Sequence, residues 1–190
     1  LPGVLGLSFV RHYNSQSKYQ GALGFGWTHS FDVALKKQND RYQLRQADGR
    51  NIYFDATEKT GYYNTQRVND GWLQVQREAV IWHWLDGQRL RFDSNGKLIG
   101  VIAVNGPALA LQYDSNDRLF LIRDPQGREL ALSHYPNGRI KALHDPSGQT
   151  TRYRYDEIGN LVSVNYADGS NRSYHYGDKH DLHNLTGITD

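Results

Sequence analysis

Four side chains of the types that bind metal ions lie close together near the end of the chain, at Asp178, His180, Asp181 and His183. Carboxylate and imidazole groups are common ligands of zinc and related ions. Their spacing matches neither a helical HExxH motif nor a carboxylate-rich calcium loop. A short polar loop explains the same residues, so we expect no bound metal there.

Two aspartates could in principle form an acid–base pair. Asp124-Pro125 and Asp145-Pro146 recur in the same local context, and their carboxyl groups would approach each other if consecutive hairpins stack. An aspartic-protease pair also needs a cleft and a shared proton, which raises one of the two pKa values. Each Asp-Pro is followed by x-Gly, a turn signature. We therefore interpret both aspartates as turn formers.

Other catalytic chemistry has little support. There is no Gly-x-Ser-x-Gly elbow, and without cysteine there is no thiolate nucleophile, thiolate metal site or disulfide. The glycines of residues 21–27 (GALGFGW) do not form a phosphate-binding loop and instead predict a tight turn before Trp27. His134 is expected to face inward with its hydrogen bonds satisfied, whereas His12, His29 and His83 have no recognisable partners. We expect no catalytic residues, no cofactor and no metal, and therefore a non-enzymatic protein.

Composition narrows the class further. The 22 basic and 20 acidic residues leave a net charge of +2, which gives no strong attraction to nucleic acid or anionic membranes. No apolar run approaches the roughly 20 residues that a membrane span requires. The 13 Tyr, 4 Trp and 19 Gly residues favour strands and tight turns. The chain should be nearly all β.

A repeat organises the second half of the chain. RLFLIRDPQG (118–127) returns as RIKALHDPSG (139–148) and as NLVSVNYADG (160–169), with a weaker copy at 97–106. After an insertion of three residues beyond Tyr176, residues 185–190 begin another copy. Because the last copy is incomplete and the chain has no methionine, we expect it to be a piece of a longer protein.

Each unit contains two predicted strands. In the second strand, large and polar side chains alternate, so one face should be buried and the other solvated. In the first strand the recurrent apolar positions, such as Leu119 and Ile122, lie three apart, and a β-bulge would bring them to one face. The sequence does not decide whether such a bulge is present. The inward positions are Leu90, Phe92, Leu111, Tyr113, Leu132, His134, Tyr153, Tyr155, Tyr174 and Tyr176, and the outward ones are Arg91, Gln112, Ser133, Arg154 and His175.

Turns separate these strands. Asp-Pro-x-Gly combines an aspartate that can bond amides ahead of it, a proline with fixed φ and a glycine that accepts positive φ. The glycines expected to set these turns are Gly106, Gly127, Gly148 and Gly169. The alternate turns read SNGK, SNDR, PNGR and EIGN, starting at residues 94, 115, 136 and 157. Asn-Gly is a strong hairpin signal.

The first part of the chain is less regular. Residues 42–54 predict a hairpin around Asp48-Gly49, and residues 72–92 predict a meander of about three strands. Residues 11–31 combine a polar loop, a glycine-rich turn and an aromatic strand. We therefore divide the chain into an N-terminal module of irregular hairpins (1–87) and a repeat array (88–190).

These motifs resemble a known family. Tyr113-Asp114 and Tyr155-Asp156, followed by GNL or DRL, an apolar position and Asp-Pro-x-Gly, resemble the YD repeats of bacterial Rhs proteins. The relatives of that family include the shell components of insecticidal toxin complexes and the teneurins. LPGVLGLSFVRHYNSQS (1–17) and GALGFGWTHSF (21–31) resemble the module that precedes those repeats. The self-cleavage motif of the family is more elaborate than the Asp-Pro turns here, so protease activity is not carried over.

The resemblance implies a curved, spiralling sheet of antiparallel β-hairpins that forms part of a hollow cocoon. Such a shell encloses a variable C-terminal toxin for delivery to competing bacteria, often by type VI secretion, so the chain would be secreted or exposed at the cell surface. Its implied partners are the rest of the shell, the toxin and a secretion spike or adaptor, with no nucleic acid and no membrane span. Exposed strand edges would allow self-association.

The tyrosine columns leave a rival function open. Tyrosines exposed on a sheet could stack on sugar rings, which would make the chain a carbohydrate-binding or adhesive module at the cell surface. Burial is commoner, because the ring contributes area and the hydroxyl finds a partner. In a hollow shell the columns would instead line the cavity and contact an enclosed guest. We expect Tyr113, Tyr153, Tyr155, Tyr174 and Tyr176 to face inward.

Overall fold

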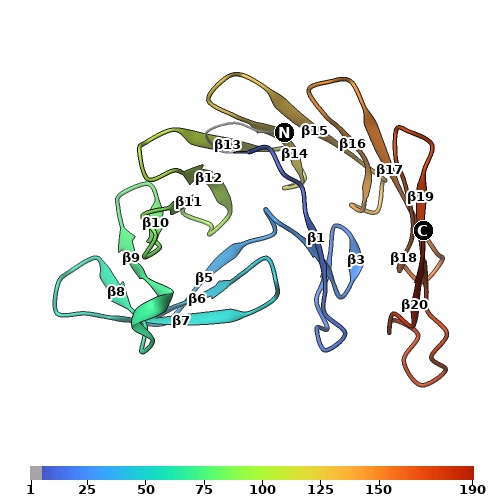
Figure 1. Cartoon of the computed structure of the whole chain (residues 1–190). Coiled ribbons are helices and arrows are strands. Elements are labelled where there is room, and N and C mark those ends of the chain that lie inside the picture. Colours follow the sequence, from blue (N-terminus) through green and yellow to red (C-terminus); the bar gives the residue numbers. More distant parts are fainter. Residues whose placement is uncertain (1–5) are drawn as a thin grey trace.

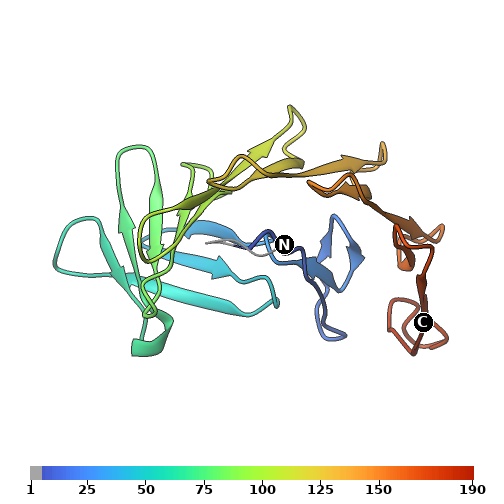
Figure 2. The same cartoon turned by 45° about the horizontal axis from the view of Figure 1, so that its top comes forward.

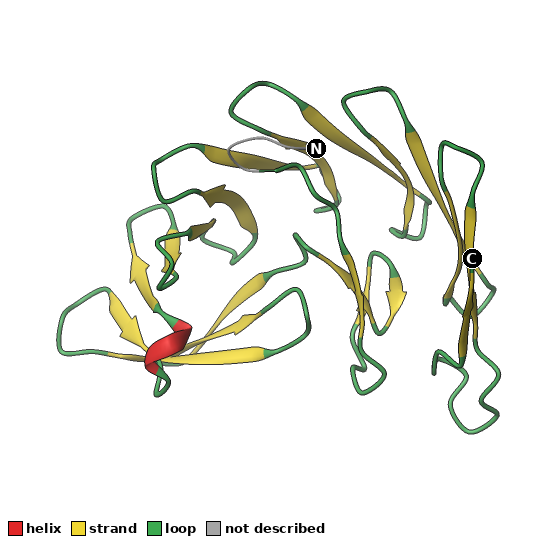
Figure 3. Cartoon of the chain, in the orientation of Figure 1, coloured by secondary structure: helices red, strands yellow, loops and turns green. Residues whose placement is uncertain are grey.

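A computed structural model of the chain describes residues 6–190, apart from the side chain of Val68. Residues 1–5, which begin the segment that carries the family resemblance, lie outside the described residues. Regular structure in the described part is almost entirely β, as Figure 3 shows, and the helical segment is a single 3-10 turn, η1 (Val68–Asp70). The prediction of an all-β fold is confirmed.

The strands of the described residues are short. They are β1 (Arg11–Tyr13), β2 (Gln20–Gly21), β3 (Gly24–Phe25), β4 (Trp27–His29), β5 (Ala34–Gln38), β6 (Arg41–Arg45), β7 (Asn51–Ala56), β8 (Tyr62–Asn64), β9 (Trp72–Val75), β10 (Val80–His83), β11 (Arg89–Phe92), β12 (Leu98–Ile102), β13 (Ala108–Tyr113), β14 (Leu119–Arg123), β15 (Glu129–His134), β16 (Ile140–His144), β17 (Thr150–Tyr155), β18 (Leu161–Asn165), β19 (Asn171–His175) and β20 (Gly187–Thr189).

One sheet dominates the molecule. Its 16 strands, β5 to β20, are antiparallel and follow one another in sequence order, so it is a continuous meander of hairpins. The strands succeed one another around a curve, with the blue N-terminal segment on its inner side (Figure 1). That segment forms two separate two-stranded sheets, β1 with β4 and β2 with β3. The predicted curved sheet of hairpins is confirmed.

The curvature brings the first strand of the sheet back to a later turn. Ala34 in β5 forms an isolated bridge with Lys97, and the Leu35 amide donates to the Gly96 carbonyl at 2.9 Å. A Cβ on Gly96 would lie 1.7 Å from the Leu35 carbonyl oxygen, so only glycine permits this approach. The edge of β5 is therefore partly covered, and the sheet spirals rather than staying flat (Figure 2).

The hairpin turns share one geometry. At the turn after β14, the Gly127 amide donates to the Asp124 carbonyl at 3.0 Å and the Asp124 amide donates to the Arg128 carbonyl at 2.9 Å. Asp124 Oδ1 accepts two further amides, from Gln126 and Arg128. This is a three-residue hairpin loop with glycine at the position of positive φ. The predicted roles of aspartate and glycine in these turns are confirmed.

A β-bulge recurs in the first strand of each repeat unit. Tyr113 pairs with Leu119 while Gln112 pairs with Leu121, so Phe120 has no partner across the ladder. The register shifts at the same place in the next units, at Ser133/His134 and at Arg154/Tyr155. Leu119 and Ile122 are consequently both buried on one face. The alternative that the sequence left open is thus decided in favour of the bulge.

The tyrosines of the two Tyr-Asp pairs, and Tyr176 at the equivalent position, each satisfy a carbonyl group beside a bulge. The Tyr113, Tyr155 and Tyr176 hydroxyls donate to the carbonyls of Leu98, Ile140 and Leu161 at 2.7, 2.9 and 2.9 Å. In each case the tyrosine lies at the end of the strand that follows the strand carrying the carbonyl group, with Tyr176 directly after the last residue of β19. The aspartate that follows, as in Tyr113-Asp114, closes the turn through its side chain. The Tyr-Asp signature therefore has two structural functions.

The hydrophobic core is a single cluster on the inner side of the sheet. It joins residues of the N-terminal segment, such as Leu23 and Trp27, to residues of the last repeats, such as Tyr153 and Tyr174. The outward positions Arg91, Gln112, Arg154 and His175 are exposed, and Ser133 is half-buried. The predicted alternation between an apolar inner face and a polar outer face is confirmed.

The less regular first half also contains the predicted hairpins. β6 and β7 pair around Asp48-Gly49 with Tyr42 opposite Phe54, and β9, β10 and β11 form the predicted meander. The three-residue insertion lies in the loop between β19 and β20. The sheet runs through residues 87 and 88 without interruption. The division into 1–87 and 88–190 remains a prediction.

Replacing Gly148 by valine should lower the free energy of unfolding by about 1–2 kcal/mol, because the residue has φ +83°. A Cβ there would meet no atom within 4 Å, so the loss would come from the backbone alone. Gly148→Asn is the matched control and should lose less, since asparagine tolerates this region. Urea unfolding measures both variants, and an unchanged stability for Gly148→Val would contradict the turn assignment.

Removing the Tyr155 hydroxyl should cost about 1 kcal/mol, because Tyr155→Phe leaves the Ile140 carbonyl without its 2.9 Å donor. Tyr53 is 45% exposed, so Tyr53→Phe serves as the control and should be nearly neutral. Both values follow from urea unfolding of the purified chain. Equal stabilities of the two variants would show that the hydroxyl makes no net contribution.

Candidate functional site

The inner face of the sheet holds the N-terminal segment through aromatic contacts. The Trp27 indole donates from Nε1 to the Tyr176 hydroxyl at 2.9 Å, and its ring meets Tyr174 edge-on with centroids 4.8 Å apart. Arg11 in β1 donates from Nη2 to the Tyr166 hydroxyl at 2.7 Å. Its guanidinium also lies 5.7 Å from the centre of the Tyr153 ring. Residues about 150 positions apart in sequence therefore form one interface.

A second group of contacts fixes the loop between β19 and β20. The Tyr13 hydroxyl donates to the His183 carbonyl at 3.0 Å and accepts from the Leu185 amide at 2.8 Å. The His183 ring stacks on Phe25 with centroids 3.6 Å apart. These contacts join the polar loop to β1 and β3.

The backbones also approach closely at one point. The Ala22 carbonyl accepts from the Ile140 amide at 2.8 Å, so the N-terminal segment bonds directly to β16. Gly24 has φ +94°, and a Cβ on it would lie 2.5 Å from the Gly159 carbonyl oxygen. Only glycine fits there. The glycines of GALGFGW thus serve a tight turn, as predicted, and in addition an interface that the sequence did not reveal.

The tyrosine columns face inward, as predicted. Tyr153 and Tyr174 are buried, whereas Tyr113, Tyr155 and Tyr176 are half-buried and use their hydroxyls in hydrogen bonds. Burial raises the pKa of Tyr113, Tyr155 and Tyr176. The columns therefore do not form an exposed stripe on the outer face. On the inner face they contact the N-terminal segment of the same chain.

The candidate metal cluster does not assemble. Asp178 accepts the His180 amide at 2.8 Å, and Asp181 accepts the His183 amide at 2.9 Å, so both carboxylates stabilise the loop backbone. His183 Nδ1 contacts Asn160 Oδ1 at 2.6 Å. Among residues 6–190 no three His, Asp or Glu side chains are arranged to hold a metal ion. The geometry is that of a polar loop.

The two repeat aspartates are occupied with their own turns. Burial would raise the pKa of Asp124, but the Arg128 amide and guanidinium outweigh it, and the pKa is lowered. The pKa of Asp145 is lowered mainly by the hydroxyl of Ser147. A pair sharing one proton would instead have one raised pKa. Their chemistry fits turn formation.

The histidines differ in their surroundings. His29 is fully buried, stacks on Phe9 with centroids 4.7 Å apart and accepts the Phe31 amide at Nδ1. The sequence indicated no partner for His29, whereas in the structure Phe9 and the Phe31 amide are its partners. His83 stacks on Trp72 at 3.7 Å. His134 faces inward, as predicted, but within the described part of the chain its ring makes no hydrogen bond.

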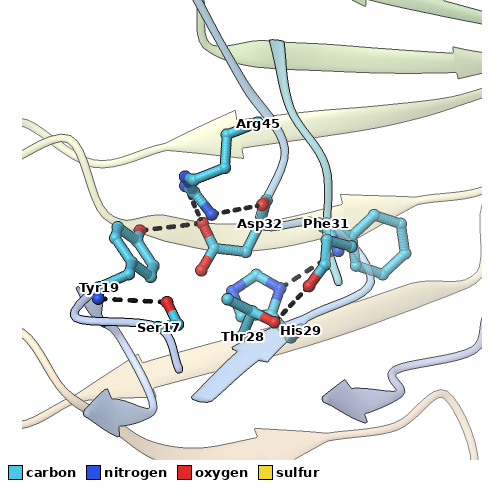
Figure 4. A network of polar contacts seen from close by, with 8 residues as sticks. Ser17, Tyr19, Thr28, His29, Phe31, Asp32 and Arg45 are labelled. Atoms are coloured by element: carbon cyan, nitrogen blue, oxygen red, sulfur yellow. Dashed lines mark hydrogen bonds and ion pairs between the residues drawn. The ribbon is translucent and has the colours of Figure 1, made fainter. Parts of the chain in front are cut away.

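A half-buried ion pair at Asp32 was not found from the sequence, because no motif surrounds it. The Arg45 Nη2 atom in β6 lies 2.8 Å from Asp32 Oδ1, and the Tyr19 hydroxyl donates to the same oxygen at 3.0 Å (Figure 4). The Arg45 guanidinium also lies 3.9 Å from the centre of the Tyr19 ring. Burial, together with the Asp32 charge, raises the pKa of Tyr19 to about 12. This network ties the loop after β1 to the main sheet.

Beside this network lies a polar cavity of about 580 Å³. The N-terminal segment forms one wall with Tyr19, His29 and Asp32, and the repeat turns form the other, including Arg118 and Arg139. Asp32 Oδ2 and Arg139 Nε are buried and have no hydrogen-bond partner within residues 6–190. Two residues that line the cavity therefore each have a polar atom, one an acceptor and one a donor, that the described protein atoms leave unused.

Two family matches agree with this architecture. Residues 1–54 match a domain of unknown function, DUF6531, and residues 134–172 match the RHS Repeat. The second match covers β16 to β18, where the bulge and the Tyr-Asp turn recur. The chain belongs to the Rhs family. No curated protein matches this Rhs chain.

No helix in residues 6–190 of the Rhs chain is long and apolar enough to cross a membrane.

Acid should destabilise this Rhs chain partly through His29. Burial lowers the pKa of His29 from 6.5 to about 4. The unfolded chain therefore binds a proton more readily, so stability is full above pH 6.5 and falls as the pH drops from 6.5 to 4, by up to about 3 kcal/mol. His29→Phe should remove this part of the pH dependence. Urea unfolding of the wild type and of His29→Phe at pH 7.5, 5.5 and 4.5 tests this prediction. An equal loss of stability with falling pH in the two proteins would contradict it.

Proposed function

We propose that this chain is a structural part of an Rhs-type shell that encloses a C-terminal toxin domain for delivery to competing cells. In this proposal the chain has no catalytic residue of its own. Residues 1–87 act as the N-terminal module, and residues 88–190 contribute hairpins of the wall. The protein acts outside the cytoplasm, exported by a dedicated secretion system or displayed at the cell surface.

The observation that carries the proposal is the contrast between the two faces of the curved sheet. The inner face is apolar and aromatic, with Tyr153 and Tyr174 buried, whereas outward positions such as Arg91 and Arg154 are exposed. A wall needs this asymmetry, because its inner face must contact a guest while its outer face stays hydrated. The inner face here already holds a segment of the same chain, through Trp27 and Arg11.

The partners follow from the same geometry. β20 ends the sheet and pairs only with β19 among the described strands, and Ile188 on it is 55% exposed. Such an edge can accept another strand. We propose that the rest of the shell continues from this edge and that, without it, copies of the chain associate there. A secretion spike or adaptor is a further proposed partner.

The test uses the full-length protein that contains this chain. In the wild type the C-terminal region should resist limited trypsin digestion, because the shell excludes the protease. Trp27→Ala removes the bond to Tyr176 and the packing on Tyr174, at a cost of about 3–5 kcal/mol, and should open the wall and speed cleavage. Arg154→Ala, on the exposed outer face, is the control and should leave protection unchanged.

Equal cleavage of the C-terminal region in native and urea-unfolded wild-type protein would contradict encapsulation. A glycan array is the second arm. Saturable glycan binding that is lost on substituting inner-face tyrosines, without protection of a C-terminal region, would favour the carbohydrate-binding function instead. The inward burial of these tyrosines weighs against that outcome.

A further inference from the structure

One position of the repeat carries a positive charge in three successive units. Lys97, Arg118 and Arg139 occupy equivalent places just after the alternate turns, and all three line the polar cavity. The first two charges are neutralised locally. Lys97 forms an ion pair with Asp117, and Arg118 Nε lies 2.8 Å from Asp114 Oδ2.

The third unit departs from this pattern. Where the neighbouring units have Tyr113-Asp114 and Tyr155-Asp156, this unit has His134-Tyr135, so the aspartate that would pair with Arg139 is missing. The side chain of Asn137 takes over the turn by accepting the Arg139 amide at 3.2 Å. Arg139 makes no ion pair within residues 6–190, and its buried Nε has no hydrogen-bond partner there. A missing carboxylate thus leaves a charged donor at the cavity.

The Arg139 side chain is nevertheless held in place. Its guanidinium packs against Gly159, where an added Cβ would lie 1.9 Å from Nη2, and it lies 5.7 Å from the centre of the Tyr155 ring. Gly159 has φ +93°, so glycine is favoured there by its backbone conformation as well as by the space it leaves. The neighbouring unit thereby positions the guanidinium rather than leaving it mobile in solvent.

The opposite wall supplies an acceptor. Asp32 uses Oδ1 for Arg45 and Tyr19, which leaves the buried Oδ2 unused. Gly21 lies against this oxygen and against the Tyr19 ring, and a Cβ on it would lie 3.0 Å from Asp32 Oδ2 and 2.6 Å from Tyr19 Cε1. The four lining cations Arg45, Lys97, Arg118 and Arg139 outnumber the lining carboxylates Asp32 and Asp117. The cavity is therefore cationic overall but presents one carboxylate oxygen.

We propose that this cavity binds a small hydroxycarboxylate. The carboxylate of the ligand accepts hydrogen bonds from Arg139, and a hydroxyl of the ligand donates to Asp32 Oδ2. Charge-assisted bonds from guanidinium to carboxylate are among the stronger ones in proteins. A cavity of about 580 Å³ lies within the usual range for small-molecule sites. The carboxylate of Asp32 favours a monoanion with hydroxyls over a more highly charged ligand.

The experiment titrates the whole chain with three probes by isothermal calorimetry. D-glucuronate has both a carboxylate and hydroxyls, D-glucose has only hydroxyls and acetate has only the carboxylate. D-glucuronate should saturate the protein, and the other two should bind at least about tenfold more weakly, since each lacks one of the two bonds. Absence of saturable D-glucuronate binding, or equal binding of all three probes, would overturn the proposal.

Two substitutions locate the site. Arg139→Gln should weaken D-glucuronate binding at least about tenfold, because it removes the charged donor. Arg154→Gln, which lies in the next unit on the exposed outer face, is the matched control and should bind like the wild type. Melting curves confirm that each variant is folded. If Arg139→Gln does not fold, Gly21→Ala, which crowds Asp32 Oδ2, replaces it. Binding by a folded Arg139 or Gly21 variant equal to that of the wild type would overturn the proposal.

Discussion

An open, curved sheet must bury its inner face against something, and the rest of this structure depends on how that need is met. The sheet from β5 to β20 is a single layer, and within the described residues no α-helix covers its apolar side. The N-terminal segment fills this place. Trp27 and Arg11 contact the aromatic columns of the last repeats, and Leu23 is completely buried. Apolar burial supplies most of the stabilisation of such a layer.

This arrangement makes the stability of the repeats non-local. Neighbouring hairpins form ladders along the sequence, but their common inner face is completed by residues about 150 positions away. Repeat arrays usually derive their stability from neighbouring units alone. Here the half-buried Asp32–Arg45 pair and the close approach of Gly24 to Gly159 also require the N-terminal segment to be in one position. Contacts of this kind give the curve a defined shape.

Regularity and irregularity in the repeat serve different ends. The regular units place a tyrosine hydroxyl on a carbonyl group and an aspartate in a turn, so buried backbone groups are satisfied in the same way in each of these units. The unit with His134-Tyr135 has neither the tyrosine nor the aspartate at these two positions, and its Arg139 is left with an unused donor beside a cavity. The unit that departs from the repeat is therefore the one that has a polar group free to bind a ligand.

The sequence by itself determined the strands, their turns and which residues face inward, because these depend on local conformational preferences and on a period of two that any strand shares. It also indicated the family, through Tyr113-Asp114 and the motif before Trp27. Only the tertiary structure decided that the bulge lies at Phe120, that His29 is buried, and that Asp32 and Arg139 line one cavity. The physical reason is that these features arise from the curvature of the sheet and from contacts between distant segments, neither of which has a local signal.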